Sequence, residues 1–426
     1  MRRSRYALAL AGGWLLLAAA LLASCSGTQA SVIRLATDRP ELLAYAELYG
    51  LLNPEHKVEI AYLQDAKDAL RSAASPDLVV ASGLCCREIL SQLDPLGMLF
   101  ERGELRAEEF YTGILALGLL EGRQRALPVS FQLPAVVSRR DGPAAGTPSG
   151  VVLELDDLRR VATGYTQGEG GRLTRIGFSP LWRPEFLYVV AVLAAQSYQV
   201  GPDSRIVWNN AELSSSVEML RRWVGETGGG LEQQEEFASR YLYEPFAKLL
   251  RSGRVLYYYV PSRELFNTPP ARLEGLDFRW LSAGERIPVL CDVVAAGVPR
   301  DARNKSGARS FLCWLCTPAV QEALVADVFA SNMEGKAFGV AGGFSALRTV
   351  NERILPRFYP SLIGHVPAAD FLLFPGPLPV DWPRIRDAVL LPWLQSAVRD
   401  TEAGSAAALP SRRLEEAVER LRGEPP

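Results

Sequence analysis

Residues 32–82 read VIRLATDRPELLAYAELYGLLNPEHKVEIAYLQDAKDALRSAASPDLVVAS, and their pattern is the main evidence for the expected fold. Residues 32–37, 57–63 and 77–82 are short apolar runs rich in β-branched residues, which is typical of strands. Two helical patterns separate these runs. Alternation of strand and helix within about 50 residues predicts parallel strands in a doubly wound α/β sheet.

The first helical pattern covers residues 38–52, where apolar side chains recur at helical spacing. Asp38 is placed to cap this helix, Glu41 to complete a capping box, and Pro40 is tolerated in a first turn. A second helix is expected around residues 66–74.

The carboxyl ends of these strands are the expected ligand-binding positions. In doubly wound sheets, ligands bind in the crevice beyond those ends. The positions concerned are residues 37–38, 63–64 and 82–84, the last of which include Ser82 and Gly83.

The N-terminus has the pattern of an export signal. Arg2, Arg3 and Arg5 precede a long apolar run, and residues 22–25 read LASC, which resembles the bacterial lipobox. On this interpretation residues 1–24 are a signal peptide, and Cys25 is the lipidated first residue of the mature chain. Acyl chains contribute about 0.8 kcal/mol per buried CH₂, so two or three of them anchor a protein firmly. An uncleaved N-terminal membrane anchor is the alternative.

Composition limits the class of protein. The chain has 426 residues, of which 48% are hydrophobic and 22% charged, as expected of one large or two medium folded domains. Removing residues 1–24 leaves 43 basic against 48 acidic residues, a net charge of −5 that argues against nucleic acid as the main partner. No other run reaches transmembrane length.

The cysteines and histidines do not form a recognisable metal or redox motif. Cys313 and Cys316 fall inside a helical pattern, and neither His56 nor His365 is close to a cysteine in sequence. We interpret Cys85, Cys86, Cys313 and Cys316 as buried packing residues, with a structural disulfide left open.

We also find no catalytic or nucleotide-binding signature: no G-x-S-x-G elbow, no Walker A sequence and no G-x-G-x-x-G. The sequence therefore predicts no enzyme, no cofactor and no metal. A carboxylate pair of the glycosidase type remains an open alternative.

Later segments contribute one extended crossing and several aromatic candidates. Residues 121–140 contain two prolines and read as an extended crossing strand, and residues 227–236 read as a flexible insertion. Aromatic residues at predicted strand ends or loops suit stacking on sugar rings, although each is also a candidate core residue. They are Trp182, Tyr258, Tyr259, Trp280 and Phe344.

The order of these segments, over about residues 32–398, resembles the family 1 extracellular solute-binding proteins of ABC transporters, the carbohydrate-type group in its lipoprotein form. The segments that carry the resemblance are residues 93–105, 110–141, 153–162, 246–260 and 293–324. They read LDPLGMLFERGEL, FYTGILALGLLEGRQRALPVSFQLPAVVSRRD, LELDDLRRVA, FAKLLRSGRVLYYYV and VVAAGVPRDARNKSGARSFLCWLCTPAVQEAL.

The resemblance implies a two-lobed periplasmic-binding-protein-like fold of type II, which is an α/β fold that closes on its solute by hinge motion. Residues 25–31 would be a tether, residues 32–137 and 287–345 lobe I, and residues 138–286 and 346–426 lobe II. Residues 125–140 and 280–296 would cross between the lobes. The implied ligand-binding residues are Ser82, Gly83, Gln132, Trp182, Tyr258, Tyr259 and Phe344.

The resemblance also implies the function. It describes a monomeric, lipid-anchored receptor outside the cytoplasm, in the periplasm or on the cell surface. Such a receptor delivers a small polar solute, expected to be a carbohydrate, to ABC transporter permease subunits. The first-lobe loop SGLCC at residues 82–86 departs from maltodextrin-binding members, which often place tryptophan or acidic residues there. The alternative is a surface lipoprotein on the same fold that is a sensor partner or antigen instead of a transport receptor.

Overall fold

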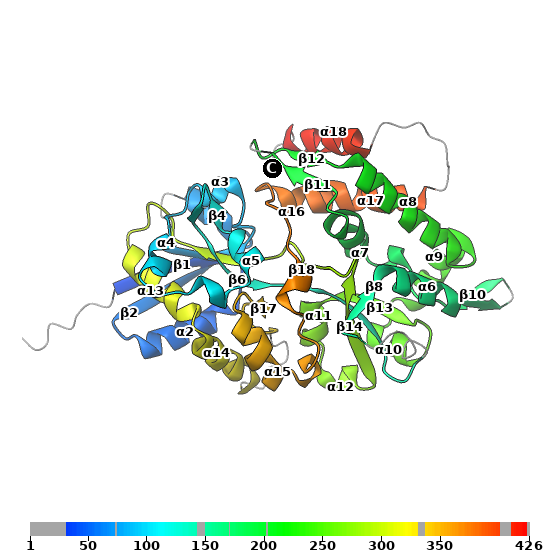
Figure 1. Cartoon of the computed structure of the whole chain (residues 1–426), viewed down its shortest axis with the longest axis horizontal. Helices are drawn as coiled ribbons and strands as arrows, with labels where there is room; N and C mark the ends of the chain where they lie inside the picture. Colours follow the sequence, from blue (N-terminus) through cyan, green and yellow to red (C-terminus); the bar gives the residue numbers. More distant parts are fainter. Residues whose placement is uncertain are drawn as a thin grey trace, which may run out of the picture.

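The computed structural model of the chain describes residues 31–72, 75–142, 150–169, 171–201, 203–330, 337–400 and 410–423. Two β-sheets, each covered by helices, form two lobes (Figure 1). The predicted signal peptide and Cys25 lie outside the described residues.

The first lobe is built on a six-stranded sheet of order β17-β6-β16-β3-β1-β2. β1 pairs in parallel with β2 and with β3, as the opening stretch predicts, whereas β16 runs antiparallel to β3 and β6. The strands are β1 (Ser31–Thr37), β2 (His56–Tyr62), β3 (Leu78–Ser82), β6 (Leu127–Phe131), β16 (Val294–Gly297) and β17 (Phe344–Ser345).

Helices cover this sheet and supply its core. α2 (Leu42–Leu52) buries Leu42, Tyr45 and Tyr49 at the predicted helical spacing. A short 3₁₀ helix, η1 (Ala66–Arg71), stands where a longer helix was expected. The other elements are α3 (Arg87–Leu90), α4 (Gly97–Glu101), η2 (Ala107–Glu109), α5 (Thr112–Ala116), β4 (Leu119–Leu120), β5 (Arg123–Gln124), α13 (Lys305–Leu315) and α14 (Pro318–Ala330).

The predicted capping box of α2 does not form. The helix begins at Leu42 with Glu41 as its N-cap residue, and no side chain caps it. The Asp38 carboxylate instead accepts hydrogen bonds from the Ser82 backbone N–H (3.3 Å) and hydroxyl (2.8 Å). The reason is tertiary: β1 and β3 are parallel neighbours, so their carboxyl ends bring Asp38 and Ser82 together.

The second lobe has a mixed four-stranded sheet of order β13-β7-β14-β8, in which β7 is antiparallel to β13 and β14. Its strands are β7 (Pro134–Arg139), β8 (Val152–Glu154), β13 (Tyr257–Pro261) and β14 (Leu276–Ser282). Two small hairpins lie outside it. They are β9 (Gln167–Glu169) with β10 (Arg172–Arg175), and β11 (Tyr198–Val200) with β12 (Ile206–Trp208).

Helices from two distant parts of the chain pack in this lobe (Figure 1). The central group is α6 (Leu155–Tyr165), η4 (Pro180–Trp182), α7 (Pro184–Tyr188), η5 (Val189–Ala194), α8 (Asn210–Glu226), α9 (Gly230–Tyr241), α10 (Phe246–Arg251), α11 (Ser262–Asn267) and α12 (Pro270–Leu273). The C-terminal group is α16 (Trp382–Ile385), η9 (Arg386–Leu390), α17 (Leu391–Arg399) and α18 (Pro410–Gly423). The expected flexible insertion at 227–236 is wrong in part, because α9 begins within it and buries Gln234 and Phe237.

Within the described ranges, three connections join the lobes. The first runs from β6 to β7 through Gln132 and Leu133. The second runs from β15 (Ile287–Pro288) to β16, and the third runs from β18 (Leu372–Leu373) to α16. β15 and β18 pair in parallel between the two main sheets.

The strand pairing moves the expected domain boundaries. The boundary at residue 137 falls inside β7, all of which belongs to the second sheet. Residues 346 onward were expected in lobe II, but η6 (Val350–Ile354) and α15 (Leu355–Phe358) pack on α14. Two 3₁₀ helices, η7 (Pro360–Leu362) and η8 (Ala369–Phe371), then lead to β18.

No single helix within the described ranges is long and apolar enough to cross a bilayer. α13 and α14 pass such a test only as a pair, bent by 74°.

Candidate functional site

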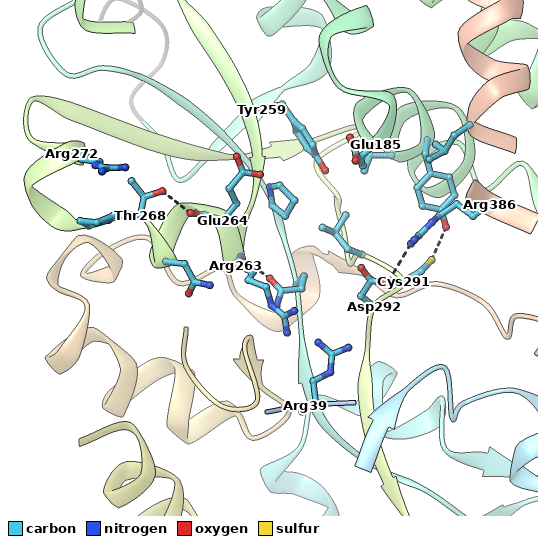
Figure 2. A pocket seen from close by; sticks show the side chains of 18 residues that line it. Arg39, Glu185, Tyr259, Arg263, Glu264, Thr268, Arg272, Cys291, Asp292 and Arg386 are labelled. Atoms are coloured by element: carbon cyan, nitrogen blue, oxygen red, sulfur yellow. Dashed lines mark hydrogen bonds and ion pairs between the residues drawn. The ribbon is translucent and has the colours of Figure 1, made fainter. Parts of the chain in front are cut away.

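A cavity of about 740 Å³ lies where the two lobes and their connections meet (Figure 2). Arg39 reaches it from the first lobe, Gln132 and Asp292 from the connections, and Tyr259 and Arg263 from the second lobe. Its size is in the range of sites that enclose a small molecule. Its wall is rich in charged and polar side chains, including four arginines and three acidic residues.

Residues at the carboxyl ends of β1 and β3 hold Arg39 in place through hydrogen bonds. Its Nε donates to Asp38 Oδ1 at 3.0 Å, and its backbone N–H donates to the Thr37 hydroxyl at 3.0 Å. Asp38 is itself held by Ser82. Only 11% of the Arg39 side chain is exposed, and its guanidinium faces into the cavity (Figure 2). Ser82 therefore helps to position the Arg39 side chain at the main cavity, because it orients the Asp38 carboxylate that Arg39 contacts.

Arg263 enters from the opposite side, near the start of α11. Its Nε donates to the Gly342 carbonyl at 3.1 Å, and a terminal nitrogen donates to the Ala341 carbonyl at 3.4 Å. Burial, followed by the positive charge of Arg39, lowers the pKa of the Arg263 guanidinium. Its head points toward Arg39 (Figure 2).

The loop that receives Arg263 is tightly folded. Val340 and Gly343 form an isolated antiparallel bridge, and between them Ala341 and Gly342 take φ angles of 46° and 78°. A positive φ is uncommon for a residue with a Cβ, and such strain often lies beside functional sites. The Ala341 N–H is satisfied by the Tyr45 hydroxyl at 2.9 Å.

Gln132 links three parts of the molecule at the first connection. Its Oε1 accepts from the Ser262 hydroxyl (2.7 Å) and from the Arg263 backbone N–H (2.8 Å), and its Nε2 donates to the Gly342 carbonyl. Its backbone carbonyl also accepts from the Leu290 N–H of the second connection (2.9 Å). Gln132 lines the cavity, but its side-chain oxygen is already committed to protein donors.

Tyr259 lines the cavity from β13 and is 1% exposed. Its hydroxyl has no hydrogen-bond partner among the described residues. Burial, followed by the charge of Glu185, raises the pKa of this phenol. The hydroxyl is directed toward the interior of the site (Figure 2).

The acidic groups of the cavity wall are paired with arginines. Arg183 makes two contacts to Glu264, at 2.8 and 3.3 Å, and lies 3.5 Å from Glu185. Asp292 is 3.2 Å from Arg386. Among the described residues these three carboxylates therefore have cationic partners.

A second, narrower cavity of about 60 Å³ adjoins the first and shares Cys291, Asp292 and Arg386 with it. Ser82 and Gly83 line this second cavity. The structure thus places the predicted first-lobe loop beside the main cavity, while Gln132 and Tyr259 line the main cavity itself.

The other predicted aromatic residues lie in packed ring clusters. Trp182 stacks on Phe237 and Tyr258 at centroid distances of 6.2 and 6.3 Å. Successive strand residues face opposite sides of a sheet, so Tyr258 packs away from Tyr259, its neighbour in β13. None of Trp182, Tyr258 and Phe344 lines either cavity described here.

Phe344 and Trp280 belong to the core. They are 1% and 0% exposed, and their ring centroids lie 5.6 Å apart. The expectation that Trp280 marks a strand end or loop is wrong, because it lies within β14 and pairs with Ala135 of β7. The same expectation is wrong for Tyr258 and Tyr259, which lie within β13 and pair with β7.

The cysteines in the described residues are free and unsuited to a metal site. No group of three or more His, Cys, Asp or Glu side chains in this part of the chain could hold a metal ion. Cys291 contacts the Tyr188 hydroxyl at 2.8 Å, and burial raises the pKa of its thiol to about 12. Burial raises the pKa of Cys316 to about 12 as well, as expected of a packing residue.

The sequence did not identify Arg39, Arg263 or Asp292 as site residues. Arg39 had a signal, since it directly follows residues 37–38, a strand end already expected to face the ligand. Arg263 had no such sequence signal, because its position depends on a contact with a loop almost 80 residues later in the chain.

Comparison with protein-family profiles and with curated proteins returned no match for this chain. Solved structures do match over nearly the whole chain. The sugar-binding protein MalE from Xanthomonas citri is 14% identical with a TM-score of 0.67, covering 93% of this chain and 100% of that one. An ABC substrate-binding protein from Listeria monocytogenes in complex with cycloalternan is 13% identical with a TM-score of 0.60, covering 92% and 98%.

A third match is an ABC transporter solute-binding protein from Agrobacterium radiobacter in complex with ribitol. It is 18% identical with a TM-score of 0.55, covering 92% of this chain and 99% of that one. The chain therefore has the two-lobed fold of periplasmic solute-binding proteins, which confirms the expected α/β fold class.

Proposed function

We propose that this chain is an extracytoplasmic solute-binding receptor that captures a small polyhydroxylated solute between its lobes and delivers it to an ABC importer. The observation that carries the proposal is the cavity of about 740 Å³, whose wall combines Arg39 of the first lobe, Gln132 and Asp292 of the connections, and Tyr259 of the second lobe. A solute there would touch both lobes at once, which is how a ligand stabilises a closed form.

The fold supports this function. Proteins of the same fold bind solutes that range from cycloalternan to ribitol. The polar wall offers donors and acceptors for hydroxyl groups, and binding in a preformed cavity requires no catalytic step. We propose a binding protein with no enzymatic reaction.

Thermal-shift measurements on ligand-free protein across sugars, sugar acids, oligosaccharides, polyols and peptides test the proposal. Ligand that binds only the folded state raises its stability by RT ln(1 + [L]/Kd), about 2.7 kcal/mol at 100 times Kd. We expect one structural class of hydroxylated solute to raise the melting temperature. A flat response across the whole panel would argue against a solute receptor.

We further propose that Cys25 carries the lipid that tethers the receptor near its permease. Replacing Cys25 with alanine should release the protein from membranes without changing solute affinity. Membrane fractionation of the variant measures this. Retention in the membrane fraction would favour the uncleaved anchor instead.

A further inference from the structure

We propose that the solute carries an anionic group, a carboxylate or a phosphate ester, and that this group binds between Arg39 and Arg263. The inference deepens the proposed function and rests on it. It concerns the class of solute, which the fold leaves open, because both neutral oligosaccharides and polyols occupy proteins of this fold.

Arg263 has no acidic partner in the part of the chain that the structure describes. Among the described residues it forms no ion pair, and its only side-chain hydrogen bonds go to two backbone carbonyls. Carbonyls orient a guanidinium without neutralising it. A cation taken partly out of water is costly unless a counter-charge compensates it.

Another arginine faces Arg263. Arg39 points toward Arg263 across the cavity (Figure 2). The hydrogen bond from Arg39 to Asp38 comes from Nε and not from the terminal nitrogens. Two guanidiniums that face one another from different lobes repel until an anion lies between them. An anion would therefore favour the approach of the lobes.

Two of the three acidic groups near Arg263 are paired with other residues, whereas Glu41 Oε2 has no hydrogen-bond partner among the described residues. Asp38 is held by Ser82 and Arg39, and Asp292 lies against Arg386. Glu41 is a third acidic group close enough to influence Arg263, but it forms no ion pair with it. The pKa of the Arg263 guanidinium is lowered. The attraction that these three carboxylates exert on the guanidinium is therefore smaller than the combined effect of burial and of the Arg39 charge.

The geometry suits an oxyanion on a hydroxylated solute. A guanidinium presents parallel N–H donors that match carboxylate and phosphate oxygens. Around the arginines the cavity supplies Asn267 and Thr268, with the unpartnered Tyr259 hydroxyl in its wall. A sugar acid or a sugar phosphate has both the anionic group and the hydroxyls that such a wall would bind.

The test uses matched pairs of solutes that differ in one charged group. Full-length protein is titrated calorimetrically with glucose, glucuronate and glucose 6-phosphate, and with galactose, galacturonate and galactose 6-phosphate. The measured quantity is the ratio of affinities, acidic over neutral, within each set. The carboxylate and phosphate arms distinguish the two sources of the anion.

The variants are Arg263→Gln and Arg39→Gln, with Arg384→Gln as a control that removes an exposed arginine outside the cavity. Hydrogen bonds to charged groups contribute about 1.5–3 kcal/mol, which is about tenfold to hundredfold in affinity. We expect wild-type protein to prefer an acidic member. Each cavity variant should reduce that preference by such a factor, and Arg384→Gln should preserve it.

The ratio is insensitive to a uniform loss of folded protein, so a destabilised variant remains informative. Equal or tighter binding of the neutral sugars overturns this inference and leaves the solute receptor standing. An acidic preference that survives both cavity variants overturns it as well, since Arg263 would then only brace its loop. Absence of binding by every member counts against both proposals.

Discussion

The loop that seats Arg263 makes a quantitative prediction at Gly342. Its φ of 78° is a conformation that side chains with a Cβ rarely adopt, and a Cβ built there would lie 2.8 Å from Arg263 Cζ. Gly342→Ala should therefore impose two costs. One comes from the backbone conformation, and the other from the displaced guanidinium.

The variant Gly364→Ala measures the backbone cost alone, because the φ of Gly364 is 77° and a Cβ there would meet nothing within 4 Å. The left-handed conformation costs about 1–2 kcal/mol for an L-residue with a Cβ, so Gly364→Ala should lose about that much. Gly342→Ala should lose the same amount of folding free energy and, in addition, the hydrogen bond of 3.1 Å from Arg263 Nε to the carbonyl of residue 342. A bond to a charged group contributes about 1.5–3 kcal/mol, giving about 2.5–5 kcal/mol in total.

Urea denaturation followed by tryptophan fluorescence measures both variants, and comparable m-values make the free energies comparable. We expect Gly342→Ala to be less stable than Gly364→Ala by about 1.5–3 kcal/mol. Equal losses in the two variants would refute the claim that Gly342 is shaped around Arg263.

Three further predictions follow from buried polar groups. Tyr259→Phe should raise stability by about 1–2 kcal/mol, because it removes a buried hydroxyl that has no partner among the described residues. Tyr45→Phe should lower stability by about 1–3 kcal/mol, because it leaves the Ala341 N–H without its hydrogen-bond acceptor. Urea midpoints that move in the same direction in both variants would contradict this prediction. Burial alone would raise the pKa of Asp77, but hydrogen bonds, including those from the Arg34 and Asn304 N–H groups, outweigh burial, so the net pKa is lowered. The ionised Asp77 carboxylate therefore stabilises the fold at pH values above its unfolded pKa of about 3.9. This contribution is lost as the pH falls through the pKa of the folded state. In Asp77→Asn the acid-induced loss should shrink, as acid titrations followed by circular dichroism would show; an unchanged acid transition would contradict this. Cys86 and Cys316 are buried, and burial raises their thiol pKa values to about 11 and about 12. They should react slowly with a thiol reagent at pH 8 in native protein and quickly in urea, and fast native labelling of these two residues, located by peptide mass spectrometry, would refute their burial.

Local pattern was enough to predict the start of the fold. The runs before Thr37 and Ser82 form parallel neighbours, as their alternation with helices requires. The carboxyl ends of those strands do reach the cavity region, where Ser82 and Arg39 lie. These features follow from periodicity and from the general geometry of parallel sheets.

Aromatic position along the sequence was a poorer guide. Phe344 and Trp280 were candidates either for sugar stacking at strand ends or loops or for the core, and long-range packing places them in one buried ring cluster. Tyr258 and Tyr259 are adjacent in sequence, but strand alternation sends only Tyr259 to the cavity. Such assignments require knowledge of which face of the strand meets the other lobe.

The charged part of the site depends on contacts between distant segments. Asp38 reads locally as a helix cap, but a neighbouring strand recruits its carboxylate to Ser82. Arg263 gains its place through the Ala341 and Gly342 carbonyls. Neither interaction has a local sequence signature, so the arginine pair emerges only from the folded chain.

The structure of the chain in complex with the tightest-binding solute of the panel tests the central claim most directly. We expect the solute to lie in the cavity between the lobes, with its anionic group within hydrogen-bond distance of Arg39 and Arg263 and its hydroxyls on residues of both lobes. A solute bound to one lobe alone, or outside this cavity, would contradict it.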